Sequence, residues 1–352
     1  MATVPLRRLF SINGIFCERK TSTESSETSD WEPESMIMIP FRERWKGFLF
    51  MKRTVCLSLM VVGLLMASNT RTKSQSAQHL LDVVELLANG ETVFGSFANT
   101  ESGAAGAVEM SRSQADYIFF DMEHGTLDMN EMRTYMQYLL DPAKILRRGR
   151  PGTDIAVWVR IPANGREMNE WMIKNALDQG AHGIITPHIE TAEQALHVVR
   201  SMRYPQRIGV TDIEPEGLRG SGPGNAVRYW GVSGSEYLSK ADVWPLDPNG
   251  ELLNMIQIEN KIGIANVEEI AKVPGISMLM AAPGDLGMAY GGDPAATEEA
   301  IQTVLRVATA AGLPCAITAN ASDVERRISE GFRVLIGGPE MIAVGRRAAG
   351  RE

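Results

Sequence analysis

A histidine and two carboxylates stand together at the end of an apolar segment, in the run Asp121-Met-Glu-His124. Histidine has an ordinary pKa near neutrality, so a histidine at the end of a strand can serve as a general base. The alternative is a histidine that caps an element or lies in the core. The run therefore marks His124 as a candidate base and leaves the structural alternative open.

An arginine ends a second apolar segment, in Trp158-Val-Arg-Ile-Pro162. Burying Arg160 without an anionic partner is costly. A substrate carboxylate or a developing oxyanion is a natural partner for a guanidinium. A structural ion pair with Glu123 or Asp121 is the alternative.

Two further clusters, Gln257-Ile-Glu259 and Ala282-Pro-Gly-Asp285, follow later apolar segments. Side chains two positions apart on a strand share one face, so Gln257 and Glu259 would both reach the interior of a barrel. Glu259 and Asp285 together offer two hard oxygen ligands, which suit Mg²⁺ or Mn²⁺ with waters and substrate in the other positions. The sequence has no His/Cys cluster with zinc spacing. A salt bridge or a helix cap is the alternative for each carboxylate.

The elements that would position these residues are apolar strands alternating with amphipathic helices from residue 80 onward, which indicates parallel βαβ units. Eight such units favour a closed (β/α)₈ TIM barrel, whose active site forms where the strands end. The expected strands are 92–98, 117–121, 155–161, 183–187, 252–258, 277–281, 315–319 and 333–336. The expected helices are 102–110, 127–140, 166–179, 191–202 with Thr191 as N-cap, 264–271, 298–311, 322–330 and one from about 341. Residues 205–250 interrupt this order and are predicted to form a long, irregular, functional loop.

Residues 1–75 lack the alternation and are predicted to be a disordered, non-barrel extension, with residues 76–352 as the TIM-barrel domain. Within the extension, segment 51–68 has the basic start, apolar run and polar flank of a signal peptide. The run is shorter than the roughly 20 residues of a comfortable membrane span. One explanation for its internal position is that Met51 is the true initiator. Both a cytoplasmic location and export to the periplasm are consistent with this pattern.

Composition excludes some classes of protein. The 352 residues carry a formal net charge of -8, which argues against a basic nucleic-acid surface. With 44% hydrophobic and 22% charged residues, the chain can bury an ordinary soluble core. Cys315 is the one cysteine of the expected barrel, so an internal disulfide is excluded there.

Taken in order, the four clusters resemble those of the HpcH/HpaI aldolase/citrate lyase family, in its metal-dependent (class II) pyruvate aldolase branch. Arg203-Tyr-Pro205 and Gly217-Leu-Arg-Gly220 also match the family, and the similarity runs from about 80 to 345. The resemblance implies a barrel of the phosphoenolpyruvate/pyruvate-binding type. It also implies cleavage of a 4-hydroxy-2-oxo acid to pyruvate and an aldehyde through a metal-stabilised pyruvate enolate.

The resemblance also implies roles for individual residues. Glu259 and Asp285 would bind the divalent metal (Mg²⁺, Mn²⁺ or Co²⁺), while Gln257 and the backbone at Gly284, beside Asp285, would hold the substrate. His124 would be the base, Asp121 would orient it, and Asp178 would raise its basicity. Arg160 would stabilise the enolate or the aldol oxyanion. Relatives usually have Gly and Ala where this chain has Ala282 and Gly284, and often Thr in place of Asn260.

Three other readings stay open. An acyl-CoA lyase of the citrate lyase β-subunit type would use the same barrel and metal. An imine-forming aldolase would need a lysine, for which Lys261 is the nearest candidate. A non-catalytic barrel that binds a keto acid or a metal is the third. The partners expected are a small 2-oxo acid and further copies of the chain in a hexamer or dimer-based assembly, with no nucleic acid and no stable membrane span in the mature domain.

Overall fold

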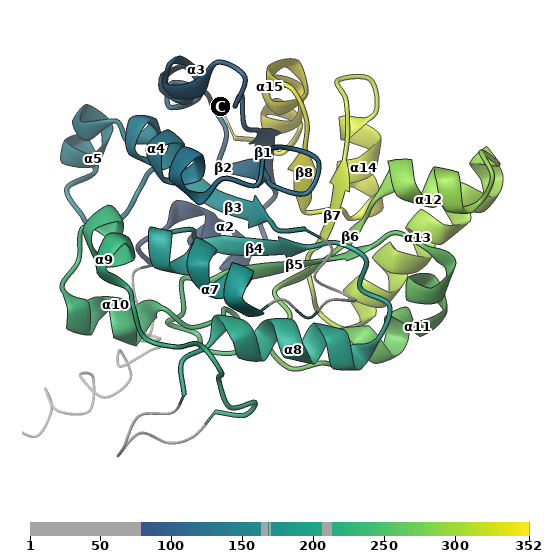
Figure 1. Cartoon of the computed structure of the whole chain (residues 1–352). Helices are drawn as coiled ribbons and strands as arrows, with labels where there is room; N and C mark the ends of the chain where they lie inside the picture. Colours follow the sequence, from purple (N-terminus) through teal and green to yellow (C-terminus); the bar gives the residue numbers. More distant parts are fainter. Residues whose placement is uncertain (1–78, 163–167, 169, 206–212, 352) are drawn as a thin grey trace, which may run out of the picture. The chain divides into compact units, whose positions relative to one another are not determined.

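The strands of this chain close into a barrel. The computed structural model describes residues 79–162, 168, 170–205 and 213–351, so the predicted extension and its signal-like segment lie outside the described residues. Eight parallel strands pair in sequence order, and β8 pairs with β1 (Figure 1). They are β1 Val93–Phe97, β2 Tyr117–Asp121, β3 Ala156–Arg160, β4 Gly183–Thr186, β5 Leu253–Ile258, β6 Met278–Ala281, β7 Cys315–Thr318 and β8 Val334–Ile336. Each lies within a predicted strand, and the (β/α)₈ TIM barrel is confirmed.

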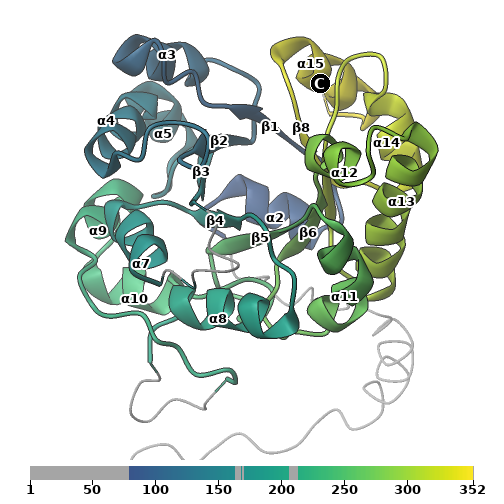
Figure 2. The same ribbon diagram turned by 45° about the vertical axis from the view of Figure 1, so that its right-hand side comes forward.

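The predicted helices form the outer layer around the strands (Figure 2). They are α3 Gly103–Met110, α4 Met129–Leu139, α7 Glu170–Gln179, α8 Ala192–Met202, α11 Lys261–Ala271, α13 Pro294–Ala310, α14 Val324–Glu330 and α15 Pro339–Ala348. Thr191 caps α8 as predicted, because its side chain accepts from the Gln194 backbone and Gln194 reaches back to the Thr191 backbone. Among the described helices, none is long and apolar enough to cross a membrane.

Five short helices were not predicted: α2 Asp82–Ala88, α5 Pro142–Arg148, α9 Gly224–Trp230, α10 Gly234–Lys240 and α12 Pro283–Ala289. The prediction that residues 205–250 are irregular is therefore wrong for α9 and α10. Tertiary contacts hold these helices: the Trp230 indole donates to the Gly180 carbonyl at 2.9 Å, and Tyr237 is fully buried. Packing of this kind stabilises helices that are too short to form alone.

Large and small side chains share the interior of the barrel. Tyr117 and Trp158 stack with their ring centroids 3.8 Å apart. On β1, Gly95 makes room for them, because a Cβ built on it would come within 2.2 Å of the Tyr117 ring. Continuing the inward-facing alternation of β2 and β3 places Asp121 and Arg160 at the strand ends, and the two residues are paired in register.

Helix α2 covers the end of the barrel where the strands begin, and in Figure 2 it lies at the centre of the ring of strands. Its Val83, Val84 and Leu87 pack with the inward-facing strand residues in one buried cluster. The carboxylate of Glu251, just before β5, accepts from the backbone of Leu80 and Leu81 at 2.7 and 3.2 Å. The opposite end of the barrel, where the strands finish, carries the predicted site residues.

Candidate active site at the carboxyl ends of the strands

Arg160 is held by two carboxylates. Its Nε and Nη2 donate to the two oxygens of Asp121 at 2.8 and 2.5 Å, and its Nη1 lies 3.1 Å from Glu123 Oε2. The residue is only 8% exposed, so this geometry provides the ion pairs that a buried guanidinium needs. Burial opposes ionisation of Asp121, but the hydrogen bond and charge of Arg160 outweigh it and keep the pKa of Asp121 below its ordinary value.

Three cationic or imidazole groups converge on Glu123. Arg160 and His124 approach its Oε2, with His124 Nε2 at 3.7 Å, and His188 Nε2 lies 3.5 Å from its Oε1. Burial raises the pKa of Glu123 even though these neighbours favour the charged form. Glu123, predicted only as a possible partner of Arg160, is therefore the residue where the contacts of this cluster meet.

The His124 side chain is 69% exposed, and its backbone N–H rather than its ring contacts Asp121, at 3.4 Å. Asp121 also accepts from the Glu123 backbone at 3.0 Å. It therefore shapes the turn that carries His124, and the imidazole itself stands at the mouth of the barrel, open to a substrate.

Glu259 and Gln257 reach the interior together, as predicted. Glu259 is 3% exposed; its Oε1 accepts from the His188 backbone at 2.5 Å and its Oε2 accepts from Gln257 at 3.3 Å. The carbonyl oxygen of Gln257 is buried and has no hydrogen-bond partner among the described residues. Burial raises the pKa of Glu259, and the charges of Asp285 and Glu123 add to that rise against the opposing effect of His188.

Asp285 lies in the first turn of α12, next to Gly284, and both are exposed. It follows β6, which pairs with β5, so Asp285 and Glu259 lie after the ends of neighbouring strands. Within the described ranges, no three His, Cys, Asp or Glu side chains are grouped so that they could hold a metal unaided. A metal bound here would need ligands from substrate or water in addition to these two carboxylates.

His188 was missed from the sequence. It lies two residues after the end of β4, and its ring spans the two acidic groups, with Nδ1 3.3 Å from Glu259 Oε1 and Nε2 3.5 Å from Glu123 Oε1. The available signal was its position after a strand end, as for His124. Its neighbours in the chain, Pro187 and Ile189, are not acidic, so no local cluster pointed to it.

Asp178 lies away from this cluster, near the carboxyl end of α7. In a β/α unit, that end of the helix faces the start of the next strand. Its oxygens contact Arg219 Nη2 at 2.9 Å and Lys174 Nζ at 3.4 Å. No contact between Asp178 and His124 is found among the described residues, so a role for Asp178 in tuning His124 stays a prediction.

The two family motifs beside the long loop hold that loop in place. Arg203 makes a bidentate pair with Asp242, at 2.6 and 2.9 Å, and Arg219 donates to Tyr237 at 2.9 Å besides pairing with Asp178. Both arginines are almost fully buried. Arg219 thus joins the segment to α7 and α10, and Arg203 joins the end of α8 to the residues after α10.

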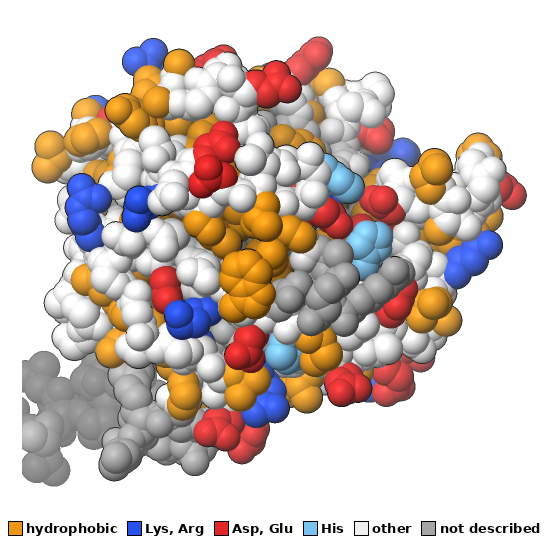
Figure 3. Space-filling view, viewed as in Figure 1, with side chains coloured by type: hydrophobic (Ala, Val, Ile, Leu, Met, Phe, Trp, Pro, Cys, Tyr) orange, Lys and Arg blue, Asp and Glu red, His pale blue; other side chains and the backbone are white. Residues whose placement is uncertain are grey.

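Several exposed apolar side chains also lie at or after the ends of strands. Five large ones lie at the end of a strand or in the segment that follows one, and Figure 3 shows hydrophobic side chains beside histidine and acidic ones. Phe97 at the end of β1 is half-exposed, and its ring lies 4.8 Å from that of Phe119, which in turn lies 5.1 Å below the Arg160 guanidinium carbon. The five are Phe97, Leu127, Trp171, Ile262 and Met288.

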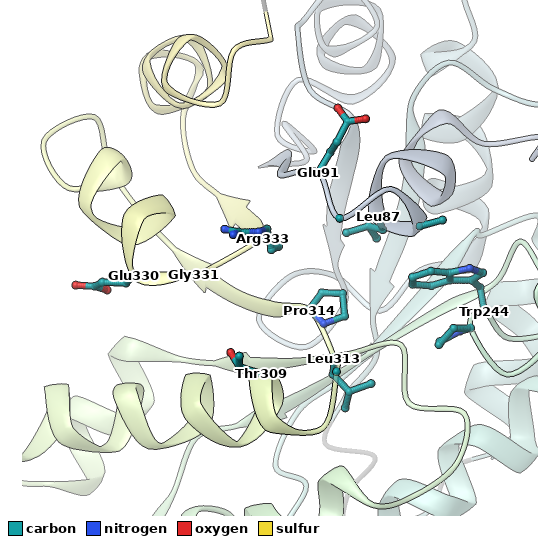
Figure 4. A pocket seen from close by; sticks show the side chains of 13 residues that line it. Leu87, Glu91, Trp244, Thr309, Leu313, Pro314, Glu330, Gly331 and Arg333 are labelled. Carbon is teal, nitrogen blue, oxygen red and sulfur yellow. The ribbon is translucent and has the colours of Figure 1, made fainter. Parts of the chain in front are cut away.

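A cavity of about 490 Å³ lies at the other end of the barrel, where Leu87, Trp244, Pro314 and Arg333 line it (Figure 4). These residues precede β1, β5, β7 and β8, and none of the predicted site residues is among its lining. Its size alone does not make it the active site, because the converging acidic, imidazole and guanidinium groups stand at the opposite end.

Comparisons with known proteins agree with this arrangement. The model of the HpcH/HpaI aldolase/citrate lyase family matches residues 95–345. A hydroxypyruvate/pyruvate aldolase from Paraburkholderia phytofirmans is 28% identical over 251 residues, which cover 70% of this chain and 86% of the relative. A 5-keto-4-deoxy-D-glucarate aldolase from Citrobacter koseri is 29% identical over 219 residues, 61% of this chain and 73% of the relative.

A solved structure of an HpcH/HpaI aldolase/citrate lyase family protein from Burkholderia cenocepacia superposes with a TM-score of 0.59 at 24% identity. The match covers 76% of this chain and 96% of the other, and it supports the fold. The resemblance found from the sequence motifs is confirmed. The chain belongs to the HpcH/HpaI aldolase/citrate lyase family and is a carbon–carbon lyase of the aldolase type.

Proposed function

We propose that this protein cleaves a 4-hydroxy-2-oxo acid to pyruvate and an aldehyde with the help of a divalent metal ion. One observation carries the proposal: the buried Glu259 faces further acidic charge, beside an amide oxygen of Gln257 that has no partner among the described residues. A surplus of oxygen ligands of this kind is what a hard cation and an oxygen-rich substrate would satisfy.

The charges at the mouth fit a divalent cation. The four carboxylates are Asp121, Glu123, Glu259 and Asp285, and Arg160 is the permanent cation among them. We expect Glu259 and Asp285 to hold the metal, since Asp121 and Glu123 are already engaged by Arg160. A divalent cation at this position supplies Lewis-acid stabilisation of negative charge on the keto oxygen of pyruvate.

The remaining steps fall to side chains of the chain itself. We expect His124, exposed at the mouth, to take the proton of the C4 hydroxyl while the C3–C4 bond breaks. The aldehyde leaves, and the three-carbon fragment is released as pyruvate after C3 gains a proton. Arg160 donates two hydrogen bonds to Asp121 and forms an ion pair with Glu123 at 3.1 Å, and we expect its remaining N–H groups to stabilise the developing anion.

The environment of Lys261 does not favour an imine mechanism. The residue is exposed at the start of α11, and its Nζ lies 5.1 Å from the ring centre of Tyr290. Lysines that form imines are usually activated by desolvation or by a second cation nearby. A solvated ammonium over an aromatic ring has neither.

The test is pyruvate release from a panel of 4-hydroxy-2-oxo acids, measured with and without EDTA. We expect EDTA to abolish activity and Mg²⁺, Mn²⁺ or Co²⁺ to restore it. Borohydride added with pyruvate should leave the enzyme active. Inactivation by borohydride while EDTA has no effect would contradict the metal mechanism and favour an imine.

We also propose that the protein assembles as a homo-oligomer, hexameric or dimer-based. The exposed apolar side chains around the mouth, among them Trp171 and Met288, support a surface that a second copy covers. Light scattering after size-exclusion chromatography should give a mass of at least twice 38.6 kDa. A monomer at micromolar concentration would contradict this proposal without touching the chemistry.

A final proposal concerns the domain boundary. The eight βα units begin beyond residue 75. A chain starting at Ser76 keeps Leu80 and Leu81, whose backbone N–H groups donate hydrogen bonds to Glu251. We expect such a chain to fold and to be as active as the full chain. An insoluble product, or one without helical circular dichroism, would show that the boundary is misplaced.

A further inference from the structure

His188 adopts a backbone conformation that is uncommon for residues other than glycine. Its φ is +56°, in the left-handed region that non-glycine residues rarely occupy. Such conformations cost free energy and are concentrated at functional sites. Here the conformation has a visible result: the His188 N–H points at the buried carboxylate of Glu259, with N and Oε1 2.5 Å apart.

The ring of His188 adds a second contact to the same oxygen and a contact to another acid. Its Nδ1 lies 3.3 Å from Glu259 Oε1, and its Nε2 lies 3.5 Å from Glu123 Oε1. Because β4 lies between β3 and β5 in the barrel, a residue after β4 can span the two sides of the site. His188 thus links the group around Arg160 to the group around Glu259.

We propose that His188 is a positioning residue for the metal-binding carboxylate. Its N–H and its imidazole engage Oε1 of Glu259, so Oε1 is fixed and the direction of Oε2 is set beside Gln257. The inference rests on the proposed function, because Glu259 is the proposed metal ligand. Partners that orient a ligand typically contribute about 10- to 100-fold to metal affinity.

The test is Mn²⁺ binding to the full chain without substrate, followed by electron paramagnetic resonance. His188→Gly removes the imidazole and accepts the left-handed backbone, and His188→Asn tolerates that backbone and retains a polar side chain. We expect His188→Gly to weaken Mn²⁺ binding about 10-fold or more, and His188→Asn to recover part of the loss. His197→Ala is the matched control, since His197 contacts the carbonyl of Met168 instead, and it should bind as wild type does.

Thermal unfolding of metal-free protein accompanies each measurement. The Gly and Asn variants should unfold cooperatively close to the wild-type temperature, because relief of the left-handed backbone offsets the lost ring contacts, so weakened binding would not reflect a damaged fold. Mn²⁺ affinity within twofold of wild type in His188→Gly, with binding still abolished by Glu259→Gln, would overturn the role of His188 and leave the proposed function standing. A loss of the same size in His197→Ala would also overturn it. A wild-type protein that binds no Mn²⁺ would overturn both proposals.

Discussion

Two buried glutamates stand at the opposite ends of strand β5, and their surroundings differ. Glu251, before the strand, is 0% exposed and surrounded by donors: the Leu80 and Leu81 N–H groups, His79 Nδ1 at 3.2 Å and Lys240 Nζ at 3.2 Å. Glu259, after the strand, is 3% exposed and accepts from the His188 backbone and from Gln257, but the charges of Asp285 and Glu123 also act on it. Glu251 has a lysine as its charge partner, whereas acidic neighbours add to the negative charge around Glu259.

The difference shows how one strand can carry both stability and chemistry. A buried charge that the protein itself satisfies contributes to the fold, and removing one partner is costly. A buried charge that the protein leaves unmatched costs stability until a ligand arrives, which is common at functional sites. The same residue type therefore predicts opposite consequences of mutation at the two ends of β5.

The largest effect is expected at the mouth. Glu259→Gln should lower the rate of pyruvate release by at least about 10³, because it removes a proposed metal ligand. The metal-free variant should unfold at the wild-type temperature or above, since the neutral amide relieves repulsion from Asp285 and Glu123. Calorimetry without metal and an assay with saturating Mg²⁺ measure the two. A variant that is both active and less stable would make Glu259 a structural residue like Glu251.

The next effect compares two histidines. His124→Ala should lower kcat by about 10²–10⁴, the usual contribution of a general base. His79→Ala removes a histidine beside Glu251, at the end of the barrel where the strands begin. It should leave kcat within about threefold, because that end is remote from the chemistry. Steady-state assays on both variants give the comparison. Equal kcat values in His124→Ala and wild type would move the role of base to another residue.

A third effect is expected in stability rather than rate. Glu251→Gln should cost about 3 kcal/mol of unfolding free energy, because the amide removes the negative charge that pairs with Lys240 and keeps one acceptor oxygen where the carboxylate offers two to the donors around it. Urea unfolding followed by circular dichroism measures the loss, and the folded variant should bind Mn²⁺ like wild type. If Glu251→Gln lost metal binding but kept wild-type stability, the proposed difference between Glu251 and Glu259 would be wrong.

The smallest effect lies on the outer layer, away from both ends. A hydrogen bond from Arg327 lowers the pKa of Glu298 from 4.5 to about 2. Because the folded pKa is lowered, this pair stabilises the protein above pH 4.5 and the contribution is lost as the pH falls toward 2. Glu298 is 40% exposed and screened by solvent, so Glu298→Gln should cost about 1 kcal/mol or less at pH 7. Urea unfolding at several pH values should show that the stability of Glu298→Gln falls less between pH 4.5 and pH 2 than that of wild type. An equal fall in both proteins would contradict the assignment.

Much of the barrel could be predicted because it depends on local order. Apolar runs such as 117–121 are short, bounded by polar residues and repeated along the chain. Every observed strand therefore lies within the range predicted for it. The helices in 205–250 were missed because the Gly, Pro and aromatic residues of this segment obscure any helical spacing of apolar residues. Contacts with residues remote in sequence stabilise these helices instead. A signal was present for α10: Ser233 and Glu236 form a capping box at its start.

The site was predictable in part for a different reason. Residues that end strands converge in any closed barrel, which placed Arg160 and Glu259 at one end. The contacts among them depend on the distance between strands that are remote in sequence. The contact of His188 with Glu123 and the left-handed backbone of His188 arise from that closure, and no spacing rule along the chain encodes them.

The close fit between Gly95 and Tyr117 has a consequence for how such sequences can diverge. With only 2.2 Å available for a Cβ at position 95, the two positions cannot change independently. A family member with alanine or a larger residue at the first position should have a smaller side chain at the second. Such a member would also lose the ring that stacks on Trp158, so three positions on β1, β2 and β3 should covary as one unit.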